Sequence, residues 1–383
     1  MTNCRVCGGH IGAPTYDVPA PALTSIMTLL DVPTRVFVCG ACGHAQSDDI
    51  PDIQAFYDTG YRISLTSENH DQIFAVATDG TITYRTDHQA ALALRLLDLP
   101  EGASILDYGA AKAVTLRKMV ANRSDLRPHV FDVSADYAAA WQGWVPEAAQ
   151  ATYAAPEGWQ NKFDAVMSHF VIEHVADPVG FMRDVRNLLR PGGSFLFSMP
   201  DVAGNPGDMA VADHVNHFSE ASLAHALASV GFELQVIDST SFPGAFFVVA
   251  KRAEATVEAA HTSKSAADAA KEARDICAFW DRASETLASG ADRYAKRKVA
   301  IYGAGFYGSW IYCRIGQAVD VVAFLDRNEN MKGATHFGIP VLSPEDLPAE
   351  AEALFIGLNP LKARAAIAAQ PWLQRPGLDH VWL

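Results

Sequence analysis

Apolar residues in the middle of the chain form short blocks, and segments with helical spacing lie between these blocks. The blocks expected to form strands are SILDYG (104–109), HVFDVS (129–134), FDAVMSHFVIEHV (163–175), GSFLFSMPD (193–201), FELQVIDS (232–239) and AFFVVAKR (245–252). Apolar positions recur at helical spacing in segments 88–99, 114–123 and 178–193, and Pro191 and Gly192 are expected to end the last helix. This alternation predicts an α/β fold with a doubly wound, mostly parallel sheet.

A second strand and helix pattern lies near the C-terminus, after an Ala-rich, charged segment (253–298) that predicts a helical linker. The G-x-G-x-x-G motif that begins at Gly303 follows a predicted strand, and Asp326 ends the next one. These residues match an NAD-binding fingerprint. Residues 299–383, however, have room for only one mononucleotide-binding half. The sequence therefore favours a small Rossmann-like docking domain, or one that helps to hold a nucleotide-linked substrate, over an NAD site.

Composition, charge and the length of the apolar runs argue against several classes of protein. A chain of 383 residues suggests two or three domains, and a formal net charge of -14 argues against a broad surface for nucleic acid or anionic membranes. No apolar run approaches the roughly 18 residues of a membrane-spanning helix. The N-terminal residues lack the apolar core of a signal peptide, so we expect a cytoplasmic protein.

Four of the six cysteines form two C-x-x-C pairs, each followed by glycine: Cys4 with Cys7, and Cys39 with Cys42. In a reducing compartment such pairs are typical of a structural zinc site, in which four thiolates close a tetrahedral shell. Two unrelated reduced pairs or a redox pair are the alternatives. The other two cysteines, Cys277 and Cys313, are expected to act as small apolar residues.

Candidate ligand-binding residues gather where the predicted strands end. The first of these strands leads into Asp107, Tyr108, Gly109 and Ala110, the second ends at Asp132, and another at Ser168, His169 and Phe170. In open α/β sheets, ligands bind at the carboxyl ends of the strands. An acidic residue at the position of Asp132 can accept hydrogen bonds from ribose hydroxyls, although it can also serve only as a helix cap.

The order of these motifs resembles class I S-adenosylmethionine (SAM)-dependent methyltransferases over residues 85–252. The resemblance rests on ILDYGAAKAVTL, FDVS, then the series FD-x-V, EH-x-x-DP and LLRPGG, and finally DHVNHFSEASLAHALASVGFEL. It implies a seven-stranded sheet whose last hairpin is antiparallel. It also implies that the turn around Gly109 approaches the methionine part of SAM. Ala111 and Ala113 stand where further glycines are expected, and alanine does not easily take a positive φ.

The whole chain resembles the sugar C-methyltransferase family, whose members methylate a carbon of a nucleotide-linked keto-deoxysugar. CRVCGG, VFVCGACGHAQ, AFYDTGYRISLTSENH and KVAIYGAGFYG carry this resemblance. It implies four parts: a zinc-binding module with a substrate-side segment (1–84), a SAM-dependent methyltransferase domain (85–252), a helical linker (253–298) and a Rossmann-like half domain (299–383). The implied ligands are SAM, a structural zinc ion and a nucleotide sugar.

The resemblance also assigns candidate catalytic residues. His214 matches the family's base, Asp213 the acidic residue before it, and His174 a second histidine of the site; His217 and Tyr61 are further candidates. Val211 stands where the family has a tyrosine, which leaves a sugar O-methyltransferase as an alternative. An inactive SAM-fold binding protein is a second alternative, because of Ala111 and Ala113. The sequence leaves open whether the protein is a monomer or a dimer.

Overall fold

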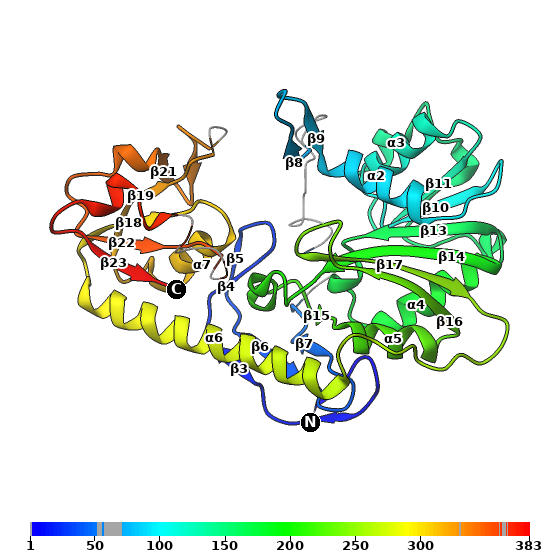
Figure 1. Ribbon diagram of the computed structural model, residues 1–383, viewed down its shortest axis with the longest axis horizontal. Coiled ribbons are helices and arrows are strands. Elements are labelled where there is room, and N and C mark those ends of the chain that lie inside the picture. Colours follow the sequence, from blue (N-terminus) through cyan, green and yellow to red (C-terminus); the bar gives the residue numbers. More distant parts are fainter. Residues whose placement is uncertain are drawn as a thin grey trace.

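The computed structural model describes residues 2–51, 56, 71–328, 331–359, 361, 365 and 367–383. A central α/β domain and a smaller C-terminal α/β domain lie side by side, and the long helix α6 (Ala266–Arg293) runs beneath both, next to the N-terminal strands (Figure 1). None of the helices in these ranges is long and apolar enough to cross a membrane.

The central sheet has seven strands, as predicted. They are β10 (Ser104–Tyr108), β11 (Arg127–Asp132), β12 (Gln150–Thr152), β13 (Phe163–His169), β14 (Leu189–Pro200), β16 (Phe232–Asp238) and β17 (Ala245–Arg252). Their order is β12-β11-β10-β13-β14-β17-β16, and β17 is antiparallel to both of its neighbours. The helices of this domain are α2 (Arg85–Leu96), α3 (Val114–Asn122), α4 (Pro178–Leu188) and α5 (Glu220–Ser229). The mixed sheet with an antiparallel final hairpin is therefore confirmed.

Two predicted boundaries were wrong. The block 163–175 is not one strand: β13 ends at His169, and Ile172–His174 form the 3-10 turn η5. Phe170 adopts a left-handed φ of 56°, which breaks the extended conformation. Helix α4 ends at Leu188 rather than at Pro191, because Leu189 is buried and already pairs with the central sheet.

The N-terminal module is completed by a strand from the central domain. Its sheet has the order β15-β7-β6-β3, with β3 (Tyr16–Val18), β6 (Thr34–Val38), β7 (Ala45–Ser47) and β15 (Asn216–His217). The module also has two short hairpins, β1 (Thr2–Asn3) with β2 (His10–Ile11) and β4 (Ala22–Leu23) with β5 (Leu29–Leu30); a third hairpin, β8 (Ile73–Val76) with β9 (Ile82–Tyr84), lies next to α2 of the central domain. Because β15 carries His217, the N-terminal sheet helps to position a predicted site residue.

The C-terminal domain has a second mixed sheet, with the order β20-β21-β19-β18-β22-β23. Its elements are β18 (Lys298–Tyr302), α7 (Phe306–Ile315), β19 (Asp320–Leu325), β20 (Thr335–His336), β21 (Ile339–Leu342), β22 (Ala353–Ile356) and β23 (Asp379–Trp382).

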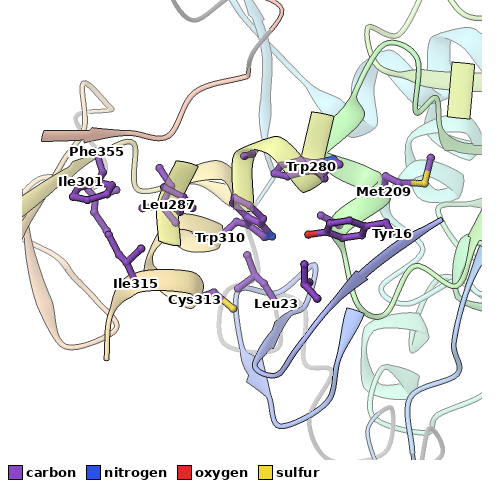
Figure 2. Close-up of a cluster of buried hydrophobic side chains, with 14 of the residues drawn as sticks. Tyr16, Leu23, Met209, Trp280, Leu287, Ile301, Trp310, Cys313, Ile315 and Phe355 are labelled. Carbon is purple, nitrogen blue, oxygen red and sulfur yellow. The ribbon is translucent and has the colours of Figure 1, made fainter. Parts of the chain in front are cut away.

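Helix α6, which lies in the predicted linker, is part of a hydrophobic core. Trp280 packs edge-on against Trp310 of α7, with ring centroids 4.5 Å apart, and the same cluster contains Tyr16 and Leu23 of the N-terminal module (Figure 2). Met209 of the central domain also belongs to it. Burial of apolar surface stabilises the folded state by roughly 25 cal/mol per Å². Helix α6 therefore holds the N-terminal module, the central domain and the C-terminal domain together through hydrophobic contacts.

Candidate active site and metal centre

The turn after β10 approaches the chain after β13 very closely. Gly109 has a φ of +82°, and a Cβ at this position would lie 2.5 Å from Cγ2 of Val171. Gly109 N and Ala110 N both donate to Phe131 O at 2.9 Å. Only glycine combines this backbone conformation with this approach. Gly109 is therefore required at the turn that the sequence predicts to hold SAM.

Ala111 and Ala113 adopt left-handed conformations, with φ values of 44° and 52°. The sequence analysis expected glycine at these positions, and the structure supplies the reason. Two contacts hold the turn in this shape: Ala111 N donates to Asp132 Oδ2 at 2.8 Å, and Trp141 Nε1 donates to Ala111 O at 2.7 Å. The backbone of the turn thus adopts the positive φ values typical of glycine, although alanine occupies both positions.

Replacing Ala111 with glycine should stabilise the protein by about 1 kcal/mol, because a left-handed L-residue costs roughly that much. Ala111 is only half-buried, so little packing is lost. Ala113→Gly is the matched comparison: Ala113 is 2% exposed, and the loss of a buried methyl group worth about 0.8 kcal/mol should cancel most of its gain. Denaturant unfolding of both variants checks this. A destabilised Ala111→Gly protein would contradict the left-handed assignment.

Asp132 and Asp107 lie beside this turn. Asp132 accepts hydrogen bonds from Ala111 N and from Ser134 N at 3.0 Å, which fixes its carboxylate at the end of β11. Burial, together with the charge of Asp132, raises the pKa of Asp107. A carboxylate has about four acceptor sites and no donor, which suits the ribose hydroxyls of SAM. The turn and Asp132 therefore fit this cofactor.

The predicted residues at the end of β13 reach the same edge of the sheet, but their side chains do different things. Ser168 Oγ donates to Tyr108 O at 2.7 Å and so joins the two strands. His169 Nδ1 lies 2.9 Å from Ser198 Oγ, and burial lowers the pKa of His169 to about 3. Phe170 lies under the Arg85 guanidinium, 4.2 Å from it. Ser168 thus stabilises the pairing of β13 with β10, whereas the Phe170 ring packs against the Arg85 guanidinium.

The predicted histidines meet around a carboxylate that the sequence analysis missed. Asp208 lies in the 3-10 turn η6 (Pro206–Ala210), and its Oδ1 forms a short hydrogen bond with His214 Nδ1. Its Oδ2 accepts from His217 Nδ1 at 2.9 Å, and His217 Nε2 lies 3.1 Å from Ser47 Oγ. The D-x-x-x-x-x-H-x-x-H spacing from 208 to 217 is the signal that could have identified Asp208.

Asp213 does not orient His214, contrary to what the adjacent positions suggested. Its carboxylate accepts hydrogen bonds from Ser25 N and Ser25 Oγ, both at 2.6 Å. Its backbone carbonyl accepts from His174 Nδ1 at 2.8 Å. Ala212 and Asp213 lie in a turn, and through its backbone carbonyl Asp213 positions His174 instead.

His174 and His214 face each other edge-on, with ring centroids 4.6 Å apart. Glu173 completes the group: one carboxylate oxygen and one ring nitrogen of each histidine all lie within 4.8 Å of one another. The Glu173 side chain is 1% exposed, and its Oε2 has no hydrogen-bond partner among the described residues. An acceptor buried without a partner is costly, which marks this group as a place for a ligand.

The surroundings of His214 and His174 shift their pKa values in opposite directions. Burial would lower the pKa of His214, but the charge and hydrogen bond of Asp208 outweigh burial and raise this pKa to about 9. Burial and the nearby His214 lower the pKa of His174 to about 4. Burial raises the pKa of Glu173 to about 8. These shifts favour a charged ring at His214 and an uncharged ring at His174 near neutral pH.

The last predicted catalytic residue, Tyr61, lies outside the described residues.

The four predicted cysteines form one cluster. Cys4 Sγ and Cys42 Sγ are 3.5 Å apart, Cys7 Sγ and Cys39 Sγ are 3.6 Å apart, and all four sulfurs lie within 4.8 Å of one another. None forms a disulfide. Four thiolates about 2.3 Å from a tetrahedral ion lie about 3.8 Å from each other. The donor set and spacing therefore fit zinc.

The C-terminal fingerprint repeats the central turn. Asp326 Oδ2 accepts from Ala304 N at 2.8 Å, just as Asp132 accepts from Ala111. A Cβ at Gly308 would lie 1.7 Å from Gly303 O, so this glycine serves close backbone packing. The start of α7 then faces η6: Tyr307 Oη accepts from Gly207 N at 3.1 Å, next to Asp208. These contacts favour docking of the C-terminal domain.

Comparison with known proteins gives the family of the central part. Residues 83–236 match the model of the family described as "Methyltransferase domain". A Mycolicibacterium smegmatis protein named "Probable S-adenosylmethionine-dependent methyltransferase" is 35% identical over 75 residues, which are 19% of this chain and 29% of that protein. The Cereibacter sphaeroides ubiquinone biosynthesis O-methyltransferase is 31% identical over 119 residues, 31% of this chain and 45% of that protein. The chain thus spans less than half the length of either relative.

Among solved structures, a SAM-dependent methyltransferase from Mesorhizobium loti is similar, with a TM-score of 0.37 and 17% identity; the match covers 43% of this chain and 98% of that one. The family match spans β10 to β14, the cofactor turn and the histidine cluster. The central part of the chain is therefore a methyltransferase domain with the class I SAM-dependent methyltransferase fold.

Proposed function

We propose that the protein is a SAM-dependent methyltransferase that methylates a carbon of a nucleotide-linked deoxysugar. The observation that carries the proposal is the closeness of the cofactor turn to the histidine cluster. Val171 packs against Gly109, and His174 N donates to Val171 O at 3.0 Å. His174, a candidate proton acceptor, is thus held by Val171, the same residue that contacts the turn proposed to hold the methyl donor. The sugar substrate rests on the resemblance of the three parts of the chain to sugar C-methyltransferases.

Each group has a distinct task in this proposal. The turn from Asp107 to Ala110 and the carboxylate of Asp132 would hold SAM, which supplies an electrophilic methyl group when bound. Methylation of a carbon next to a ketone needs a base for the proton on that carbon and a donor for the enolate oxygen. His174 and His214 lie next to each other, so both would be able to contact one acceptor molecule. Burial of the cluster strengthens these interactions.

We also propose that Cys4, Cys7, Cys39 and Cys42 hold a structural zinc ion. Four thiolates leave no open position for substrate, so the ion would stabilise the module rather than take part in the reaction. Its link to the site is indirect, through the pairing of β7 with β15.

Calorimetry with SAM and S-adenosylhomocysteine tests the proposed activity. We expect both to bind, and we expect label from methyl-labelled SAM to appear in at least one member of a panel of nucleotide-linked keto-deoxysugars. Absence of binding at millimolar concentration would refute the methyltransferase proposal and would favour an inactive binding protein. Binding without transfer to any sugar of the panel would refute the substrate class.

His214→Ala should reduce methyl transfer by about 100- to 1,000-fold, because it removes a group that stabilises charge in the transition state. SAM affinity should stay within about twofold, since Asp132 and the Gly109 turn are untouched. The control is His225→Ala, at an exposed position of α5, which should leave both quantities unchanged. Full activity of the His214 variant would exclude this residue from the reaction.

A sugar O-methyltransferase is the second candidate, and Val211 favours it. Val211 is buried and lies beside Leu23, so it presents no hydroxyl in the place of the family's tyrosine. For a hydroxyl acceptor a base alone suffices. Product analysis separates the two: loss of deuterium from a labelled carbon during turnover marks C-methylation, and its retention marks O-methylation.

A further inference from the structure

We infer that His174 is the base that removes the proton, and that His214 is the cationic donor that stabilises the resulting enolate oxygen. This inference rests on the proposed function and reverses the role that the family resemblance implies for His214. It follows from the hydrogen bonds that each ring makes and from the charges that surround each ring.

The contact of His174 with the backbone sets its tautomer. A carbonyl oxygen can only accept, so the 2.8 Å contact with Asp213 O requires the proton on Nδ1. In the neutral ring the basic lone pair is then on Nε2. The Asp213 carboxylate is 3.6 Å from Nδ1 and would favour an imidazolium, but its two oxygens are engaged by Ser25. Burial and the cationic neighbour His214 act in the opposite direction and prevail.

The surroundings of His214 favour the charged ring. Asp208 is 3% exposed, and its ion-pair partners among the described residues are His214 and His217. A carboxylate this deeply buried needs a compensating positive charge nearby. His214 and His217 both contact the Asp208 carboxylate, and the charge of Asp213 adds to the stabilisation of charged His214. Its Nδ1 is held by Asp208, so Nε2–H is the donor that can reach a ligand.

The remaining charged groups around the pair are consistent with this division. Glu173 is buried against both rings, and burial keeps its carboxyl largely protonated near neutral pH, so it adds little negative charge beside His174. The Arg85 guanidinium lies over the Phe170 ring, and its positive charge acts to lower the pKa of Glu173 and of His169. His217 lies beyond Asp208, with its other nitrogen on Ser47. The charge of the pair is therefore set mainly by Asp208.

His174 and His214 together account for the proposed proton transfer. The C–H bond next to the ketone breaks, its proton goes to Nε2 of His174, and its electron pair moves toward the carbonyl oxygen. Nε2–H of His214 donates a hydrogen bond to that oxygen and keeps its own proton. The enolate pair would then form the new C–C bond as the methyl–sulfur bond of SAM breaks, with the electron pair of that bond left on sulfur, and the ketone would be restored. His174 then releases its proton to solvent after the product leaves.

Nitrogen NMR of the full chain, labelled with ¹⁵N in the histidine rings, tests the charges directly and needs no substrate. At pH 7 we expect His214 to show two protonated ring nitrogens, and His174 one protonated and one bare nitrogen. His214→Gln and His174→Gln spectra assign the two signals. His225→Gln is the control, because it should remove one signal and leave the other two unchanged. A neutral His214 or a charged His174 at pH 7 would overturn the inference.

Asp208→Asn provides the second measurement. Asparagine keeps the shape but removes the charge, so His214 should lose its proton at least 100-fold more readily and become neutral at pH 7. The raised pKa of His214 means that its ion pair stabilises the fold fully below about pH 6.5, and that this stabilisation is lost as the pH rises through about 9. An unchanged His214 signal in the folded variant would show that Asp208 does not set its charge.

The pH profile of turnover separates this inference from the proposed function. With His174 as base and His214 as charged donor, the rate of methyl transfer falls as the pH rises through about 9. With His214 as base, the rate rises over the same interval. Failure of SAM to bind would refute the methyltransferase proposal, whereas a rate that rises with pH would refute only the assignment of the two histidines.

Discussion

Cys39→Ser should abolish the proposed metal binding by the N-terminal module and unfold that module. Cys39 is 1% exposed and is one of the four thiols that form the proposed metal site. Binding of structural zinc supplies about 10–16 kcal/mol at pH 7, which a module of short strands cannot replace. We expect metal analysis to find about one zinc per chain in the native protein and far less in the variant.

The effect should reach the active site. β7 pairs with β15, and Ser47 of β7 contacts His217, so loss of the module should reduce methyl transfer while SAM still binds to the central domain. The matched control is Cys313→Ser. Cys313 Sγ donates to Pro21 O at 3.1 Å, a bond that serine can reproduce, and this variant should keep its metal. A stable, metal-free native protein would refute the zinc proposal.

Gly109→Ala should lower SAM affinity by about 100-fold or more. The new Cβ would lie 2.5 Å from Val171, and the φ of +82° is one that alanine disfavours by about 1–2 kcal/mol. Either the Gly109 turn or Val171 must move to relieve this contact, and both movements change the turn proposed to hold SAM. Overpacking adds about 1–3 kcal/mol of destabilisation. Calorimetry with SAM measures the first effect, and denaturant unfolding measures the second.

Gly102→Ala is the control for this substitution. Gly102 also has a positive φ, +67°, but a Cβ there would meet nothing within 4 Å. It should therefore show the backbone cost of about 1 kcal/mol without any loss of SAM affinity. Equal SAM affinity in the Gly109 variant and the native protein would mean that this turn does not hold the cofactor.

Local features of the sequence were enough for the fold of the central domain. Strand and helix periodicity is a property of consecutive residues, and so are the capping and turn preferences that separate the elements. Six apolar blocks, the turn at Gly109 and the two C-x-x-C pairs could therefore be read from short segments, whereas the count of seven strands came from the family resemblance and β12 matched no predicted block. The end of helix α4 at Leu188 was missed because pairing of Leu189 with Phe163 decides it, and the end of β13 at His169 because Phe170 adopts a left-handed φ.

The partners of the site residues were decided by the tertiary structure alone. Asp213 was the obvious neighbour of His214 in sequence, but Asp208 holds that ring, and Ser25 from the N-terminal module takes the Asp213 carboxylate. The same holds for β15, which joins a sheet built from residues 16–47.

The sequence by itself determined which elements form, which glycine the cofactor turn requires and which cysteines can bind metal, because each depends on neighbouring residues. The tertiary structure decided which carboxylates surround each histidine, and with them the proposed charge of each ring. That property depends on burial and on carboxylates brought from separate segments, and a buried charge shifts a pKa far more strongly than any neighbour in an exposed chain can.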